Sequence, residues 1–171
     1  MEDSQYDKLV EFGNKQFNIL INISSNCEKQ KLLNRLFQFY NSIDVKKFRF
    51  FSKDISLAFA NKEKFIDYKN KYCNNFDIEI FTLLSDFIKD TIEEKKNTEL
   101  NNKTVLLLDG NWCIQLIDSI LIEKLFAISN EYNIYIIYLI NDKNITISEN
   151  IQSKIDFFIN ENISFNIIKN N

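Results

Sequence analysis

Three polar segments of the sequence carry side chains that could bind an anion or a metal ion. In residues 24–30, the ammonium group of Lys29 could contact a phosphate, with the amide of Gln30 beside it. Asp109 ends an apolar run and places a carboxylate in the second polar segment. Asn141 follows another apolar run and opens the third polar segment. These residues form the candidate binding site.

Several groups that catalysis commonly uses are missing. The sequence has no histidine, which excludes His-based acid-base catalysis, a Ser-His-Asp triad and any His-ligated metal site. Its three cysteines are far apart and form no CxxC pair, so a zinc site is not expected. The only glycines are Gly13 and Gly110, whereas a phosphate-binding loop normally needs its own glycines. No catalytic residue is therefore predicted.

The candidate residues follow segments whose composition predicts strands. The continuous apolar runs at 104–109 and 133–140 are typical of central parallel strands, which are buried on both faces. The other predicted strands cover 17–23, 45–51, 155–159 and 164–169, with a hairpin turn at 160–162; the predicted helices start near residue 31 and cover 61–72, 76–95 and 114–130. This alternation predicts an α/β fold, a three-layer sandwich around a mainly parallel sheet. Ligands bind such sheets beyond the carboxyl ends of the strands, where the candidate residues lie.

Length and composition narrow the class of protein further. A chain of 171 residues is expected to form one domain, residues 1–171. The net charge of -3 provides no basic field for nucleic acid, and no apolar run reaches the roughly 18 residues of a membrane span. The first residues are polar and of mixed charge, unlike a targeting peptide, so a cytoplasmic location is expected. The abundance of Lys, Asn, Ile and Phe is typical of an AT-rich genome.

The segment at 24–30 has the position of a P-loop, between a predicted strand and a predicted helix. A P-loop uses glycines to let backbone N–H groups surround a phosphate, a lysine for the β- and γ-phosphates, and a hydroxyl for magnesium. When Lys29 is aligned with the motif lysine, Ile23 and Glu28 occupy the glycine positions. Gln30 replaces the magnesium-binding hydroxyl. The segment therefore has the location and the lysine of a P-loop without its other groups.

The second half of the chain resembles a known family more closely. VLLLDG, residues 105–110, resembles a Walker B strand, in which Asp109 would hold magnesium through water. SNEYNIYIIYLIND, residues 129–142, resembles the sensor strand of additional-strand P-loop ATPases, above all the FtsK/HerA-type DNA-packaging ATPases of poxviruses and other large DNA viruses. The resemblance covers about residues 17–160. It implies a P-loop NTPase-like fold of the additional-strand type.

The chain departs from that family where the chemistry is done. Gly110 stands where a second acid orients the attacking water, and Glu131 and Tyr132 replace an Arg-His pair. Asn141 replaces the sensor Gln, and Gln152 replaces an arginine expected near a subunit boundary. An arginine finger alone can supply about 10³–10⁵ in rate. The resemblance with these losses implies a catalytically degenerate ATPase-like protein, so enzymatic activity is not expected.

Two alternatives within the same superfamily stay open. The chain could be a divergent but active ATP-dependent DNA-packaging ATPase, which would then use Mg-ATP with Asp109 at the metal. It could also resemble non-catalytic clamp-loader subunits, whose Ser-Arg-Cys signature corresponds in position to Ser153, Lys154 and Ile155. The clamp-loader type carries a helical lid after its core, and few residues remain beyond Ile159. The packaging-type comparison is therefore preferred.

Each singled-out residue also has a structural interpretation. Lys29 could be a solvated lysine in the first turn of a helix, and Asp109 could cap a turn or a helix start. Trp112 could anchor a partner, although packing against the core is the preferred interpretation. The lysines in 61–72 alternate with acids, which favours a solvated helix face over a binding patch.

Together these observations predict a binding or assembly component, linked to DNA packaging or virion assembly in a virus with an AT-rich genome. A protein partner or a homo-oligomer is expected, in the host cytoplasm if the protein is viral. Nucleic acid remains a third kind of partner, which the charge does not support. No cofactor is expected, and no membrane association.

Overall fold

The computed structural model describes residues 18–72, 77–97, 103–117, 119, 120, 123, 124, 127 and 133–160. Its strands are β1 (Asn18–Asn22), β2 (Val45–Ser52), β3 (Asp77–Phe81), β4 (Lys103–Asp109), β5 (Ile134–Ile140) and β6 (Phe157–Asn160). Its helices are α2 (Asn26–Ser42), α3 (Ile55–Tyr72), α4 (Leu84–Asn97), α5 (Cys113–Ile117) and α7 (Glu149–Lys154). Strands and helices alternate along the chain, as an α/β fold requires.

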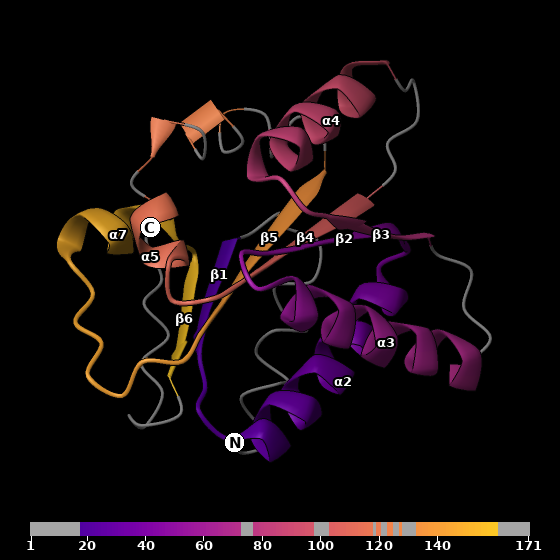
Figure 1. Cartoon of the computed structure of the whole chain (residues 1–171), viewed down its shortest axis with the longest axis horizontal. Coiled ribbons are helices and arrows are strands. Elements are labelled where there is room, and N and C mark those ends of the chain that lie inside the picture. The colour runs from indigo at the N-terminus through magenta and orange to yellow at the C-terminus, as the bar shows by residue number, and fades with distance from the viewer. Residues whose placement is uncertain are drawn as a thin grey trace.

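The six strands form one sheet in the order β3-β2-β4-β5-β1-β6, and every pair is parallel (Figure 1). The predicted fold class is confirmed, including a central position for the two apolar strands, β4 and β5. β5 lies between β1, which precedes the lysine-bearing segment, and β4, which ends in Asp109. This inserted strand is the arrangement that defines the additional-strand type of P-loop NTPase-like fold.

Helices cover both faces of the sheet and give it two hydrophobic cores. On one face, α2 packs over odd-numbered residues of β1 such as Ile19 and Ile21, and α3 covers β2 and β3. On the other face, α4, α5 and α7 pack over residues such as Leu20. Because side chains of a strand alternate between faces, the apolar runs in β4 and β5 supply both cores at once.

The predicted helix over 76–95 is wrong in its first part. Residues Asp77–Phe81 form strand β3, and the helix α4 starts only at Leu84. The sequence DIEIF alternates polar and apolar residues, which suits a strand with a different environment on each face. In β3, Glu79 forms an ion pair with the buried Arg49 of β2, a tertiary contact that helical periodicity does not reveal.

Two predicted helices have different bounds. α3 starts at Ile55 instead of residue 61, because the side chain of Asp54 accepts a hydrogen bond from the backbone N–H of Ser56 and opens the helix there. α5 ends at Ile117 and a bend follows at Ser119. Ile120, Glu123, Lys124 and Ala127 are again helical, and the other residues of 118–130 lie outside the described part of the chain.

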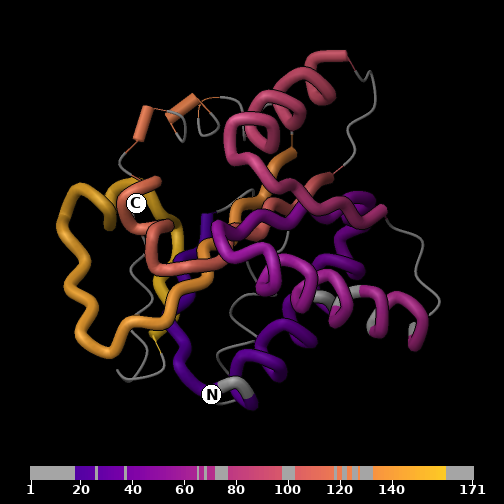
Figure 2. The backbone as a smooth tube through the Cα atoms, viewed as in Figure 1, coloured from indigo at the N-terminus to yellow at the C-terminus, as the bar shows by residue number. Residues whose placement is uncertain are grey.

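The end of the described chain contains only the first strand of the predicted hairpin, β6. β6 runs parallel to β1, with Ile19 opposite Phe157 and Asn22 opposite Asn160. Figure 2 shows this yellow strand beside the indigo β1, although the two come from opposite ends of the described sequence. The predicted strand at 164–169 and most of the turn at 160–162 lie outside the described residues. Among the described residues, no helix has the length and apolar character needed to cross a membrane.

Candidate functional site

The carboxyl ends of β1, β4 and β5 surround a small cavity of about 210 Å³. Its lining includes polar residues that follow these strands: Ser24, Lys29, Asp109, Gly110, Asn111 and Asn141. Ligand pockets for drug-sized molecules usually measure about 300–1,000 Å³. The structure therefore brings the predicted residues Lys29, Asp109 and Asn141 to one cavity at the expected sheet edge, and this cavity is small.

Lys29 and Asp109 form an ion pair across the cavity. The Nζ atom of Lys29 lies 2.9 Å from Oδ2 of Asp109, and their side chains are only 14% and 7% exposed. The same oxygen accepts a hydrogen bond from Nδ2 of Asn61 on α3, at 2.8 Å. The interpretation of Lys29 as a solvated lysine is wrong, because its ammonium group is mostly buried against a carboxylate.

The backbone of Asp109 is held as firmly as its side chain. The hydroxyl of Ser52 at the end of β2 donates to the carbonyl oxygen of Asp109 at 2.8 Å, and the indole N–H of Trp112 donates to it at 3.1 Å. In the described part of the chain, the carboxylate accepts only from the side chains of Lys29 and Asn61. Asp109 is thus an ion-pair partner here rather than a helix cap.

The turn between β1 and α2 has no room for a phosphate cradle. It consists of residues 23–25, and Ile23 is buried with its N–H bonded to the carbonyl of Ile140. Ser25 caps α2 with its own hydroxyl, which accepts from the N–H of Glu28. The Glu28 carboxylate accepts from the ammonium of Lys31, so it does not fill the cavity. A P-loop instead uses a motif of about eight residues to surround the phosphates.

Gly110 occupies the position that the resemblance aligns with a second acid, and its geometry excludes a side chain. Its φ of +136° lies in a region that other residues rarely adopt. A Cβ atom built on Gly110 would lie 2.3 Å from Nε1 of Trp112, well inside van der Waals contact. The glycine at this position is therefore required by the turn and by the indole that covers it.

Trp112 packs as the structural interpretation expects. Its ring meets that of Phe51 edge to face at 5.3 Å, and the Lys53 ammonium lies 5.4 Å from the ring centre. The indole also contacts the core beneath α4 and α5. A role for Trp112 in anchoring a partner remains a prediction.

The remaining predicted residues have separate surroundings. The backbone N–H of Asn141 donates to Oδ1 of Asn111, whose amide donates back to the Asn141 carbonyl, so the two loops are tied together. The amide of Gln30 donates to Asn34 one turn further along α2 and does not line the cavity. Gln152, in the place of the family's arginine, donates to the carbonyl of Ile147 in its own segment.

Sequence reasoning missed the contribution of α3. Leu57 lines the cavity, Asn61 binds Asp109, and Lys64 lies near enough to Lys29 for burial and that ammonium group to lower the pKa of Lys64. The spacing of 57, 61 and 64 places these residues on one helical face, which could have been recognised if the helix start at Ile55 had been predicted. A fully buried Asn on such a face is a sign of a specific polar partner.

These residues do not fit Mg-ATP. The turn lacks glycines, Gln30 points along α2, and the Asp109 carboxylate is already held by Lys29 and Asn61. Among the residues that the structure describes, no group of three or more His, Cys, Asp or Glu side chains could hold a metal ion. The arrangement stabilises a closed pair of charges at the place where the fold would hold phosphate and magnesium.

The strand order gives this chain a P-loop NTPase-like α/β fold. No protein-family profile matches the sequence, and no curated protein matches it. Among solved structures, a chain described as EssC (ATPases 2 and 3) from Geobacillus thermodenitrificans is similar, with 13% identity and a TM-score of 0.48. The match covers 83% of this chain and 31% of that chain.

Proposed function

We propose that this protein is a P-loop ATPase-like domain that no longer hydrolyses ATP and acts as a binding or assembly component. The Lys29–Asp109 ion pair carries this proposal. The two groups that would contact phosphate and magnesium bind each other at 2.9 Å in a mostly buried position. A ligand that needs either group must first break the pair.

The energetic cost of breaking the pair opposes nucleotide binding. Removal of one partner from a buried ion pair typically costs about 3–5 kcal/mol, because the other charge is left without compensation. Phosphate binding to Lys29 would leave the Asp109 carboxylate with Asn61 alone and would add a second anion beside it. The turn at 23–25 has three residues and no glycine, unlike the longer glycine-containing loop that surrounds phosphates in a P-loop.

The loss of catalytic groups supports the same proposal. Gly110 cannot be replaced by the acid that would orient a water molecule, because the indole of Trp112 covers it. The sequence contains two arginines, Arg35 and Arg49. The side chain of Arg49 is 2% exposed and forms ion pairs with acids of β3 and α4, away from the cavity. Phosphoryl transfer depends on such groups for most of its electrostatic stabilisation.

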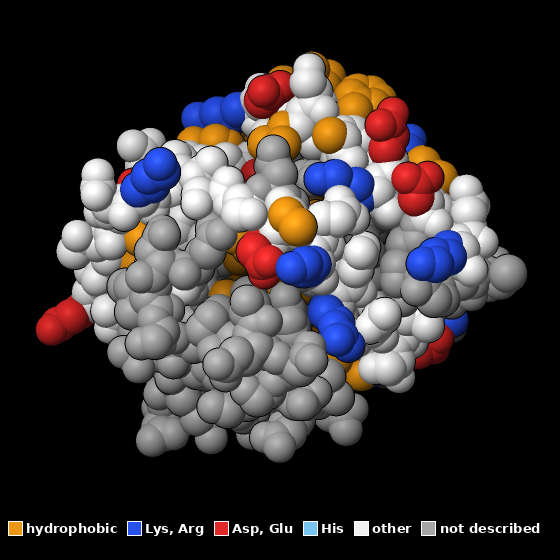
Figure 3. All heavy atoms as spheres, turned by 90° about the horizontal axis from the view of Figure 1, so that it is seen from below, with side chains coloured by type: hydrophobic (Ala, Val, Ile, Leu, Met, Phe, Trp, Pro, Cys, Tyr) orange, Lys and Arg blue, Asp and Glu red, His pale blue; other side chains and the backbone are white. Residues whose placement is uncertain are grey.

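The expected partner is a protein. On the face seen in Figure 3, basic and acidic side chains are interspersed, which does not favour a nucleic-acid surface. The resemblance to packaging ATPases points to a DNA-packaging or virion-assembly machine, in which a homologous active ATPase is the natural neighbour. The clamp-loader comparison leads to the same kind of role, a non-catalytic subunit.

A titration with Mg-ATP tests the proposal. A ligand at about 100 times its Kd stabilises the folded state by about 2.7 kcal/mol, so specific binding would raise the melting temperature measurably. The fluorescence of Trp112, whose indole contacts the carbonyl of Asp109, gives a second readout close to the cavity. We expect neither signal to change and no phosphate to be released.

The divergent-ATPase alternative predicts the opposite outcome. Saturable stabilisation by Mg-ATP that disappears in Lys29→Met but persists in Lys31→Met would overturn the proposal. Lys31 is a matched control because it lies on the same helix, is 63% exposed and forms an ion pair with Glu28 three residues away.

A further inference from the structure

Strand β3 forms one edge of the sheet and has a different chemical environment on each face. β2 pairs with it on one side, and no strand of the described part of the chain pairs with it on the other. Ile78 and Ile80 face the core beneath α2 and α3. Asp77, Glu79 and Phe81 face α4, since side chains alternate along a strand. An unprotected edge of this kind is a template for pairing with another strand.

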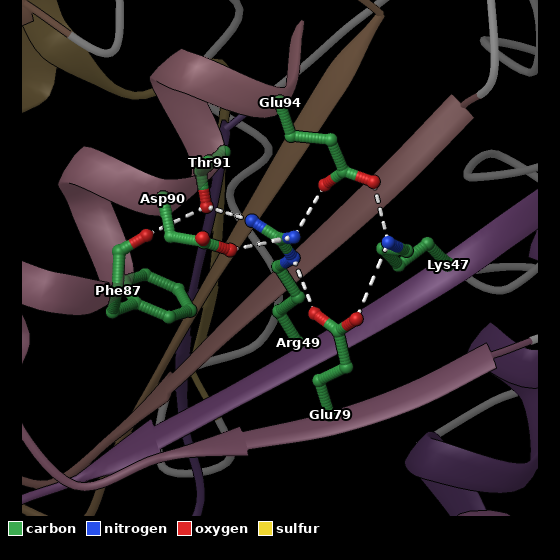
Figure 4. Close-up of polar contacts among 7 residues, drawn as sticks. All are labelled: Lys47, Arg49, Glu79, Phe87, Asp90, Thr91 and Glu94. Atoms are coloured by element: carbon green, nitrogen blue, oxygen red, sulfur yellow. Dashed lines mark hydrogen bonds and ion pairs between the residues drawn. The ribbon is translucent and has the colours of Figure 1, made fainter. Parts of the chain in front are cut away.

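The α4 side of this edge is lined by carboxylates, and their basic partners lie on β2, further from the edge. Figure 4 shows Arg49 at the centre of the network, with Glu79 from β3 and Asp90, Thr91 and Glu94 from α4 around it. Lys47 of β2 bridges Glu79 and Glu94. The network joins two strands, β2 and β3, and the helix α4 through the buried guanidinium of Arg49.

In this network the acidic side chains are more exposed to solvent than the basic ones. Arg49 is 2% exposed and Lys47 18%, whereas Glu79 is 38%, Asp90 56% and Glu94 29% exposed. Solvent therefore meets mainly the acidic ends of the network, because the three acids are more exposed than Arg49, Lys47 and the buried Lys95, which lies near Glu94. A second strand at this edge would find negative charge on the α4 face and the half-buried side chains of Ile78 and Ile80 on the α3 face.

We propose that the open edge of β3 binds an extended segment of a partner protein in which basic and apolar residues alternate. Main-chain hydrogen bonds to the edge would give affinity, and the alternating side chains would give specificity. Basic residues would lie beside Asp77 and Glu79, and apolar residues would extend the surface of Ile78 and Ile80. This proposal rests on the proposed function, because it supplies the partner of an assembly component.

A second copy of this chain fits the edge poorly. Antiparallel pairing of two β3 strands around a two-fold axis keeps the α4 faces on the same side. Glu79 would then lie opposite, or next to, the same acids of its copy, and like charges across strands are destabilising. Asp90, at 56% exposed, would add to the repulsion. The edge therefore selects a partner of opposite charge.

Fluorescence anisotropy with a short labelled peptide of alternating lysine and valine tests the proposal on the full chain. We expect saturable binding at least about tenfold tighter than that of an alternating glutamate–valine peptide, or of a peptide with the same lysines and valines in two blocks. Hydrogen exchange should slow at backbone amides within residues 77–81 and stay unchanged at β6. Equal binding of the three peptides, or binding without slower exchange in β3, would overturn the proposal.

Charge-reversed variants locate the site. Asp77→Lys, at an exposed position at the start of β3, should weaken the binding of the lysine–valine peptide by about tenfold. Glu149→Lys makes the same charge change on α7, which precedes the opposite edge strand, and should leave the affinity unchanged. Equal weakening by both variants would mean non-specific charge attraction. If raising the protein concentration without peptide slowed exchange in β3 and produced dimers, the proposal would be overturned, because the edge would then bind a second copy of this chain.

Failure of this inference differs from failure of the proposed function. The peptide experiments involve neither Lys29 nor Asp109, so a negative result leaves the Mg-ATP titration unaffected. Conversely, ATP hydrolysis would overturn the proposed function even if the peptide bound to β3.

Discussion

At the scale of single residues, two features of the candidate site support the proposed loss of nucleotide binding. Lys29 and Asp109 keep the positions expected of a lysine and a metal-binding acid, but they bind each other. Gly110 occupies the place of a second acid in a conformation that excludes one. Both features make the site stable and closed, and each can be tested by substitution.

Lys29→Met should lower the free energy of unfolding by about 3 kcal/mol, because Asp109 would remain buried without its cation. Chemical denaturation followed by Trp112 fluorescence would measure the loss. Lys31→Met, at an exposed position on the same helix, should change stability by less than about 0.5 kcal/mol. A solvated role for Lys29 would make the two variants alike.

Gly110→Ala should destabilise the fold by about 2 kcal/mol or more, since it adds backbone strain and a contact with the indole of Trp112. The double variant Gly110→Ala with Trp112→Ala removes the contact but not the strain. Its two substitutions should therefore be non-additive in thermal unfolding. Full additivity would contradict the close approach of Trp112 to residue 110.

At the scale of elements, helix α4 joins the edge strand β3 to the rest of the sheet. Its buried face consists of Phe87, Ile88, Thr91 and Lys95. Thr91 donates to the carbonyl of Phe87 and accepts from Arg49, so one hydroxyl connects the helix to β2. Two titratable groups on α4, Lys95 and Glu94, both make the stability of this region rise with pH, Glu94 in the acid range and Lys95 in the alkaline range.

Lys95→Met should stabilise the protein at pH 7 by about 1–2 kcal/mol, because a buried ammonium group is replaced by an apolar side chain. Burial, with Arg49 and Lys47 nearby and Glu94 opposing them, lowers the pKa of Lys95 from 10.5 to about 8. The cost of the charged lysine is fully present below pH 8 and disappears as the pH rises towards 10.5. The advantage of the variant in thermal unfolding should shrink over that range.

Glu94→Gln should cost about 1 kcal/mol at neutral pH. Burial alone would raise the pKa of Glu94, but Lys47 and Arg49 outweigh it and lower that pKa below 4.5. The stabilisation by Glu94 is therefore fully present above pH 4.5 and is lost as the pH falls through its lowered value. Melting temperatures of the two proteins should converge in acid. Glu93→Gln, at a 60% exposed neighbour, should show little difference at any pH.

At the scale of the whole molecule, one sheet supplies both hydrophobic cores. β1, β4 and β5 contribute alternate side chains to the core beneath α2 and to the core beneath α5. Because the same strands line both cores, unfolding of the sheet disrupts both cores together. The prediction of a single domain leads to a cooperative transition, which solution experiments can examine.

Denaturant unfolding should give coincident transitions by far-ultraviolet circular dichroism and by Trp112 fluorescence. Circular dichroism reports all helices, whereas Trp112 reports the core beneath α4 and α5. A fluorescence change that precedes the loss of helix would show that the two cores unfold separately, against the single-domain prediction.

Local patterns in the sequence determined the elements with the strongest signals. Continuous apolar runs identified β4 and β5, and helical spacing of leucines identified α2, because burial of these faces is the main stabilising term. The missing histidines and glycines limited the chemistry before any fold was known. The strand β3 was missed, because its partner, the buried Arg49, is supplied by another strand.

Only the tertiary structure decided what the candidate site does. Lys29 and Asp109 are 80 residues apart, and Asn61 reaches them from a third element. Whether a lysine and an aspartate at one sheet edge bind a ligand or each other depends on ångström-scale distances and on burial. Local sequence patterns predict the alternating strands and helices, and their parallel crossovers bring the residues to the same edge of the sheet. The short turn at 23–25 and the contact of Asn61 with Asp109 arise from tertiary packing.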